Sequence, residues 1–407
     1  MRCASRSGAP VLLAAAGAVL ATAGCGGSSG TGSSLAGGAP QRAPFTIGAV
    51  FSLTGGGDVY GPQQRKGAEL AVEQINAAGG VDGAPLRLVV RDDRSDPVTG
   101  AARMRTLIAS RRVVAVLGPT LSLVAVRADP VANALHTPVL AVSNTVDRIV
   151  GDCAYPCAWI WRDSLGERVA VRANVAAYVK VSHPGTAVTV QTAGDVLGTD
   201  DVDNAVAAFR ANGVRMLGGW KITPQQNVAA EVRTALAKRP DVLFVGTSFG
   251  TFAAQVMAAA RKDGFTGAIL GGNTFNSSQT LRLAGKAGLG ARSGAAWWSG
   301  NDFPANGRFI TSYRQAYGAA PDQFAAQAYV GVEILADALH RAGLAGRDAT
   351  LVEQRAALQR ALGDVAISTV LGPFRFTASH DVSQIAWILA MNGQGRHRLV
   401  GFCNPGC

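Results

Sequence analysis

The chain has 407 residues, of which 48% are hydrophobic and 16% are charged, and this composition excludes a wholly disordered chain. One small core is also excluded, because a domain takes roughly 100–200 residues and the length therefore predicts two or three domains. Lysine and arginine outnumber aspartate and glutamate by 38 to 27, but aromatic residues make up only 6% of the chain, so no nucleic-acid partner is expected.

The first 24 residues are predicted to be an export signal. Arg2 and Arg6 precede an apolar run over 11–21, which is shorter than the roughly 20 residues that span a bilayer. Small residues then lead to Cys25, and a Gly/Ser-rich segment follows it. This pattern resembles a bacterial lipoprotein cleavage site. The resemblance implies that Cys25 carries a lipid and that residues 25–44 are a flexible tether to the outer face of the cytoplasmic membrane. The alternative is an ordinary signal with an incidental cysteine.

Short apolar segments alternate with segments of helical periodicity through most of the chain. Strands are predicted over 45–53, 86–90, 113–118, 138–142, 158–162, 186–191, 214–220, 241–246, 268–272, 385–390 and 397–401. Helices are predicted over 61–80, 97–110, 122–136, 166–180, 200–212, 225–238, 249–263, 278–285, 305–318, 323–342 and 350–362. Apolar strands separated by helices of this length predict parallel sheets with helices on both faces.

The repetition predicts an α/β fold with two similar lobes. The first lobe covers residues 45–162 and the second covers 163–298. The remaining chain is divided between them, with 299–371 assigned to the first lobe and 372–407 to the second. A chain that crosses between two lobes several times predicts a hinge and a cleft.

Four cysteines lie in the body of the chain, at Cys153, Cys157, Cys403 and Cys407. Disulfides persist in an exported protein, and four cysteines allow three connectivities. We expect the two local pairs, 153–157 and 403–407, because proline and glycine between or beside them supply turns. A zinc site is the alternative, but neither pair has a histidine beside it. The chain contains no dinucleotide-binding or P-loop motif, so no cofactor and no metal are expected.

Several short motifs follow one another in a recognisable order. They include Ser52-Leu53-Thr54-Gly55, Gly79-Gly80-Val81-Asp82-Gly83, Val116-Leu117-Gly118-Pro119 and Leu371-Gly372-Pro373-Phe374. Together they resemble the type 1 periplasmic binding proteins, in the leucine/isoleucine/valine-binding branch, over about residues 45–391. The resemblance implies two doubly wound parallel-sheet lobes that are joined by three crossovers and close on a small ligand. It also implies a monomer that performs no chemistry and delivers its ligand to an ABC permease.

Ligands of open α/β sheets bind beyond the carboxyl ends of the strands. Ser122 follows strand 113–118 at the start of a helix, where its hydroxyl and nearby N–H groups are placed to hold a carboxylate. The alternative for Ser122 is a plain helix cap. Ser143, Asn144 and Thr145 follow the next strand in the same way. The resemblance also implies that Tyr60 covers the ligand, although an exposed loop residue is the alternative.

In the second lobe, the resemblance implies ligand contacts from Leu197, Ser248, Phe249 and Asn273. Asn273 stands where the family carries an acid that receives an amino acid's ammonium group. Because a buried ammonium without a carboxylate is costly, either another acid such as Asp58 or Asp195 replaces it, or the ligand carries no cation.

Two other functions remain open from the sequence. Gly246-Thr247-Ser248-Phe249-Gly250 matches the nucleophile motif of α/β-hydrolases, for which the chain offers Asp302, Asp322, Asp337, His340, His380 and His397 as partners. No HGGG-type oxyanion loop accompanies it. A lipoprotein that senses a ligand for a membrane receptor is the second alternative. We interpret the chain as a substrate-binding lipoprotein that captures a branched-chain or neutral amino acid, or a related small carboxylate, for an ABC importer.

Overall fold

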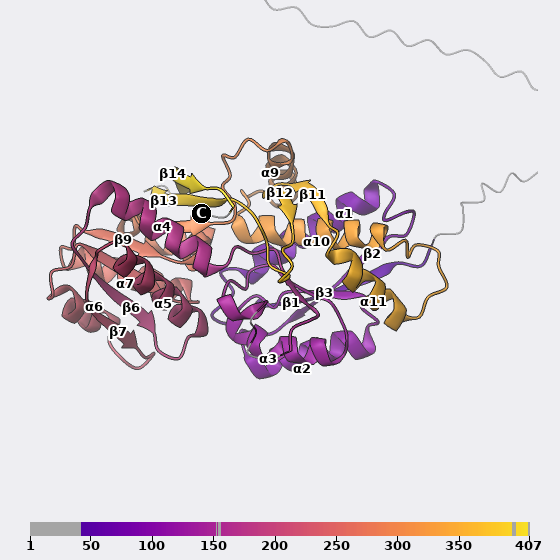
Figure 1. Ribbon diagram of the computed structural model, residues 1–407, viewed down its shortest axis with the longest axis horizontal. Coiled ribbons are helices and arrows are strands. Elements are labelled where there is room, and N and C mark those ends of the chain that lie inside the picture. The colour runs from indigo at the N-terminus through magenta and orange to yellow at the C-terminus, as the bar shows by residue number, and fades with distance from the viewer. Residues whose placement is uncertain (1–41, 152, 154–155, 393–395, 406–407) are drawn as a thin grey trace, which may run out of the picture. The chain divides into compact units, whose positions relative to one another are not determined.

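The computed structural model describes residues 42–151, 153, 156–392 and 396–405 (Figure 1). The predicted signal, Cys25 and Cys407 lie outside the described residues. The chain from Gln41 onward forms one compact unit. Among the residues described, none of the helices is both long enough and apolar enough to cross a membrane.

Five parallel strands form the first sheet, in the order β2-β1-β3-β4-β5. Their bounds are β1 (Phe45–Phe51), β2 (Leu86–Asp92), β3 (Ala115–Leu117), β4 (Val139–Ala141) and β5 (Ile160–Arg162). Along β1, Ile47 and Phe51 pack into one apolar cluster, whereas Val50 packs into another on the opposite face. This strand is apolar throughout because both of its faces are buried.

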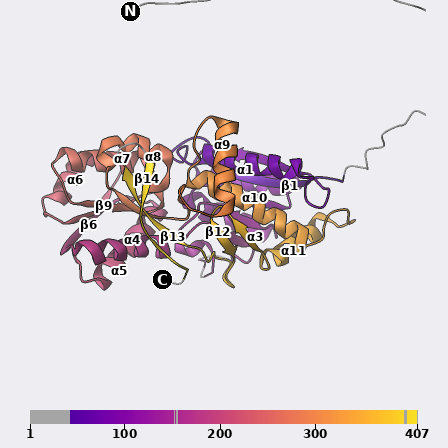
Figure 2. The ribbon, with the colours of Figure 1, turned by 90° about the horizontal axis from the view of Figure 1, so that it is seen from above.

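Helices cover both faces of the first sheet, and the sheet with these helices is called the first lobe here. On one face lie α2 (Pro97–Ser110) and α3 (Ser122–Ala134); on the other lie α1 (Gly61–Ala77), α10 (Gln323–Arg341) and α11 (Leu351–Leu362) (Figure 1). The helix α9 (Pro304–Tyr317) packs against α1 (Figure 2). The two clusters of apolar side chains join these helices to opposite faces of β1 and β3. Helices that come after β10 of the second lobe in sequence therefore complete the core of the first lobe.

Seven strands form the second sheet, in the order β14-β13-β10-β9-β8-β6-β7. Their bounds are β6 (Thr186–Thr192), β7 (Arg215–Ile222), β8 (Val242–Gly246), β9 (Ala268–Gly271), β10 (Arg292–Ala295), β13 (Ala386–Asn392) and β14 (Arg396–Cys403). The first five of these pair in parallel, while β13 and β14 add an antiparallel edge. The second sheet is therefore mixed and not wholly parallel.

Helices also cover both faces of the second sheet, and together they form the second lobe. On one face lie α4 (Glu167–Ser182) and α5 (Val196–Ala211); on the other lie α6 (Val228–Leu236), α7 (Gly250–Lys262) and α8 (Ser278–Ala284). Single 3-10 turns occur at η1 (Asp147–Ile149), η2 (Asn273–Asn276) and η3 (Gly285–Gly288). The helix expected to begin at residue 200 begins at Val196 instead, because Val196 and Leu197 pack against the apolar cluster of the first lobe.

The chain crosses between the lobes three times: after β5, after β10, and after the hairpin of β11 (Ala366–Thr369) and β12 (Gly372–Arg375). The buried guanidinium of Arg162 binds the carboxylate of Asp381 and thereby ties the first crossing to the third. A disulfide joins Cys153 to Cys157, as predicted. Cys403 is also disulfide-bonded, while its predicted partner lies outside the described residues.

Candidate ligand-binding site between the lobes

Two loops of the first lobe reach the interface at the ends of β3 and β4. Ser122 is 2% exposed and forms the first residue of α3, so the helix cap falls on Leu121 and not on the serine. The Ser143 hydroxyl accepts from Gln64 Nε2 at 2.7 Å and donates to the carbonyl of Thr120 at 2.6 Å. Because both functions of this hydroxyl are used within the first lobe, Ser143 holds the two loops together.

Asn144 and Thr145 lie beside Ser143 and are also buried. Neither polar atom of the Asn144 amide finds a hydrogen-bond partner among the described residues, although Asn144 is 0% exposed. Thr145 Oγ1 donates to Glu167 Oε1 at 2.7 Å, and Glu167 opens α4 in the second lobe. Thr145 therefore links the lobes, while Asn144 offers a donor and an acceptor that the protein leaves unused.

Tyr60 lies between the lobes and not in an exposed loop. Its hydroxyl donates to the carbonyl of Ser248 at 2.9 Å, and its ring packs on Phe324 with 4.6 Å between centroids. Burial raises the pKa of Tyr60, so the phenol stays protonated and keeps this bond at all physiological pH values. A second bond across the interface runs from the Ser277 hydroxyl to the carbonyl of Val59, at 2.9 Å.

In the second lobe, Ser248 is held by an acid. Its hydroxyl donates to Asp195 Oδ1 at 2.6 Å, and its backbone N–H donates to the other oxygen of the same carboxylate. Phe249, the neighbouring residue, caps α7, and its ring lies close to Gly56 of the first lobe. Leu197 packs into the apolar cluster of the first lobe. Ser248, Phe249 and Leu197 therefore all lie near the interface between the lobes, and both oxygens of the Asp195 carboxylate accept hydrogen bonds from Ser248.

The surroundings of Ser248 do not form the catalytic triad that the hydrolase alternative requires. Ser248 does lie between β8 and α7, where the motif expects a nucleophile. However, its hydroxyl pairs with Asp195, and no histidine in the described part of the chain is bonded to it. The hydrolase motif needs a histidine between the serine and the acid, and among the described residues no histidine takes that place.

Asn273 joins three parts of the structure. Its backbone N–H donates to Glu167 Oε1 at 3.3 Å, and its Oδ1 accepts from Gln323 Nε2 at 2.6 Å. Gln323 lies at the start of α10, so this second bond again crosses between the lobes. Of the acids proposed to compensate for Asn273, Asp58 is exposed in its loop and Asp195 is engaged with Ser248.

The acids that contact the candidate site are instead Glu167 and Asp201, which sequence reasoning missed. Both are 0% exposed. Burial raises the pKa of Glu167 to about 7 and raises the pKa of Asp201 well above its ordinary value. Glu167 Oε2 and Asp201 Oδ1 find no donor among the described side chains, and the two carboxyl groups interact with each other. The pair is therefore expected to share a proton.

Comparison with known proteins identifies the class to which this fold and interface belong. A family model described as periplasmic binding protein matches residues 44–396, so the chain belongs to the periplasmic binding protein family. Proteins of this family act outside the cytoplasm and bind solutes without transforming them.

Several individual relatives carry names of the branch that the sequence resembles. The chain is 24% identical over 362 residues to the Leu/Ile/Val-binding protein BraC3 of Rhizobium johnstonii. The matched region covers 86% of this chain and 91% of the relative. A leucine-binding protein of Thermotoga maritima has a TM-score of 0.80 at 19% identity, covering 89% of this chain and 99% of that chain. A solute-binding protein of R. palustris in complex with benzoate has a TM-score of 0.78 at 22% identity, covering 89% and 97%. These structures confirm the two-lobed fold.

Proposed function

We propose that the protein captures a branched-chain or neutral amino acid, or a related small carboxylate, between its lobes and presents it to an ABC importer. The observation that carries this proposal is the set of buried polar groups where the lobes meet. The amide of Asn144 bonds to none of the residues that the structure describes, and Thr145, Glu167 and Asn273 lie at the same interface. Buried polar groups without partners are costly unless something else bonds them, and a small polar ligand would do so.

The ligand would stabilise the closed arrangement of the lobes. Tyr60 and Ser277 already bond across the interface, and a ligand that contacts both lobes adds interactions that only the closed state can make. The permease would then distinguish the loaded protein from the empty one by the closure of its lobes.

The two ligand classes differ in the group that they place near Asn273. An amino acid brings an ammonium group, and Glu167, which bonds the backbone of Asn273, is placed to receive it. A carboxylate without an amine needs only donors, which Asn144 and Ser122 would supply. The relatives include a leucine-binding protein and a protein solved with benzoate, so both classes occur within the fold.

The proposed location rests on residues outside the described structure. Cys25 would carry a lipid and hold the chain at the outer face of the cytoplasmic membrane. The variant Cys25→Ala should then move the protein from the membrane fraction to the soluble extracytoplasmic fraction, which fractionation and immunoblotting would measure.

The function is tested by a thermal-shift screen of the purified chain against neutral amino acids, aliphatic and aromatic carboxylates, and amides. A ligand at 100 times its dissociation constant adds about 2.7 kcal/mol to the free energy of unfolding, which raises the melting temperature by a few degrees. Ser122→Ala and Asn273→Ala should each raise the dissociation constant of a confirmed ligand by about tenfold, as measured by calorimetry. Unchanged affinity in both variants would show that the ligand binds elsewhere.

A further inference from the structure

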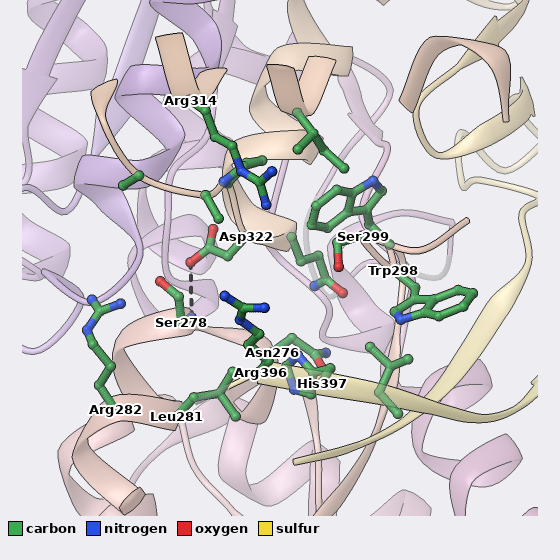
Figure 3. Close-up of a pocket in the computed structure, with 17 residues that line it drawn as sticks. Asn276, Ser278, Leu281, Arg282, Trp298, Ser299, Arg314, Asp322, Arg396 and His397 are labelled. Atoms are coloured by element: carbon green, nitrogen blue, oxygen red, sulfur yellow. Dashed lines mark hydrogen bonds between the residues drawn. The ribbon is translucent and has the colours of Figure 1, made fainter. Parts of the chain in front are cut away.

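A cavity lies apart from the residues of the candidate ligand site (Figure 3). Its volume is about 370 Å³, which falls within the range of about 300–1,000 Å³ typical of small-molecule sites. Its walls come from α8, from the crossing after β10, from α9 and the start of α10, and from the edge strands β13 and β14. None of the residues predicted to bind the cleft ligand lines it. Both lobes contribute to it, because α9 packs on the first lobe and α8 on the second.

Three arginines surround this cavity. Figure 3 shows Arg314 on one side, and Arg282 and Arg396 on the other. All three are exposed, and no carboxylate within the described residues forms an ion pair with any of them. Guanidinium groups bind carboxylate and phosphate groups through charge-assisted hydrogen bonds, so three of them around one cavity indicate a site for an anion.

The other polar groups of the cavity do not neutralise this charge. The carboxylate of Asp322 accepts from the backbone N–H groups of Ser278, Phe324 and Ala325, so its acceptor capacity is largely used by the protein. His397 Nε2 donates to the carbonyl of Phe275 at 3.1 Å, and burial lowers the pKa of His397 to about 4, so it is neutral at physiological pH. Three guanidinium groups and one carboxylate leave a net charge of +2 around the cavity.

The cavity also has an apolar side. Trp297 and Leu389 are buried and Trp298 is half-buried, and all three lie in the cavity wall. A cavity with both cationic and apolar walls suits a small organic anion better than a bare inorganic ion. We propose that this cavity is a second binding site, which takes a small dianion such as a dicarboxylate or a phosphate ester.

The position of the site gives it an effect on the lobes. Arg314 belongs to the first lobe, and Arg282 and Arg396 belong to the second, so an anion bound by all three draws the lobes together. Two residues of the same wall, Asp322 and Gln323, make bonds to Ser278 and Asn273 across the interface. The dianion therefore favours the closed state, and binding at the two sites is mutually reinforcing.

The test is isothermal titration calorimetry of the purified full chain with succinate and with inorganic phosphate, at neutral pH. Acetate at matched ionic strength serves as the monoanion. We expect at least one dianion to bind at one site per chain, while acetate does not bind. Binding of succinate would indicate a site for a dicarboxylate, and binding of phosphate would indicate a site for a phosphate group. The absence of binding by both dianions, or equal binding of acetate, would overturn the proposal.

Variants locate the binding. Arg314→Gln and Arg396→Gln should each raise the dissociation constant of the dianion by about tenfold, because each substitution removes a charge-assisted hydrogen bond. Arg210→Gln removes an equally exposed and unpaired arginine on α5 and should leave the affinity unchanged. Ser122→Ala, which alters the candidate ligand site, should also leave it unchanged. Loss of dianion binding in Ser122→Ala would place the anion between the lobes and overturn the second site, without contradicting the proposed function.

Discussion

Glu167 and Asp201 are buried acids whose burial could not be predicted from the sequence. Each lies within a helix whose other residues are partly charged, and an acid in such a segment resembles part of a solvated face. In the structure both helices turn these acids toward the lobe interface, where Thr145 and Asn273 bond to Glu167. That contact joins residues from separate lobes, so no local pattern could indicate it.

The raised pKa values of this pair predict that stability depends on pH. The pKa of Glu167 rises from 4.5 to about 7 on folding, so the folded state holds a proton that the unfolded state releases. Its contribution to stability is fully present below about pH 4.5 and is lost as the pH rises through about 7. Glu167→Gln keeps the acceptor for Thr145 and places an amide donor toward Asp201. We expect the variant to be more stable than the parent at pH 8, by up to about 3 kcal/mol in urea unfolding.

The matched control is Glu73→Gln, which removes an exposed acid from α1. It should leave the profile of unfolding free energy against pH within about 0.5 kcal/mol of the parent. If Glu167→Gln follows the same profile as Glu73→Gln, the buried pair does not hold a proton.

The loop residues were easier to find than these acids. Ser122, Asn144 and Thr145 follow strand ends, and parallel strands bring such loops to one edge of a sheet. Their burial agrees with that reasoning. The hydrogen bond between Ser143 and Gln64 was not predictable, because Gln64 lies on a helix nearly 80 positions earlier in the chain.

Among the elements, the parallel strands were the most predictable. Strands buried on both faces read as continuous apolar runs, which the sequence of β1 and β8 shows clearly. Helix ends were less predictable where tertiary packing decides them. The first turn of α5 forms because Leu197 packs on the other lobe, and α1 ends at Ala77 because Gly79 and Gly80 adopt positive φ angles.

The contact between α1 and α10 depends on a small residue. A Cβ atom at Gly67 would lie 2.1 Å from the carbonyl oxygen of Ala325, so α10 leaves no room for a side chain there. Gly67→Ala should therefore separate the two helices and lower the free energy of unfolding by about 1–3 kcal/mol. Chemical denaturation of the variant and the parent measures the difference.

Gly307 provides the matched control within α9. A Cβ atom at this position meets nothing within 4 Å, and its φ is not in the left-handed region. Gly307→Ala should raise the free energy of unfolding by about 0.5–1 kcal/mol, because alanine has less freedom to lose on folding. Equal effects of the two substitutions would contradict the close approach of α1 and α10.

At the scale of the whole molecule, the lobes are in direct contact. Hydrogen bonds from Tyr60 and Ser277 cross the interface, and Gln323 bonds Asn273 from the other side. Each such bond contributes only about 1 kcal/mol, so a small set of them sets the balance between open and closed states.

Tyr60→Phe removes one of these bonds and keeps the ring that packs on Phe324. We expect the ligand-free variant to have a larger radius of gyration in small-angle scattering, and its ligand to bind about three- to tenfold more weakly. Tyr329→Phe is the control, because the hydroxyl of Tyr329 bonds to Gln74 within the first lobe. A radius and an affinity equal to those of the control would mean that Tyr60 does not stabilise closure.

The return of the chain through both lobes determines when the protein can fold. The first sheet is finished by residue 162, yet its core lacks α10 until residue 341 has emerged. The second sheet lacks β13 and β14 until the last residues arrive. Each lobe can bury part of its apolar surface earlier, but neither lobe is complete until these late segments are available. The two lobes are therefore completed together and late in folding, because both wait for segments from the same late part of the described chain.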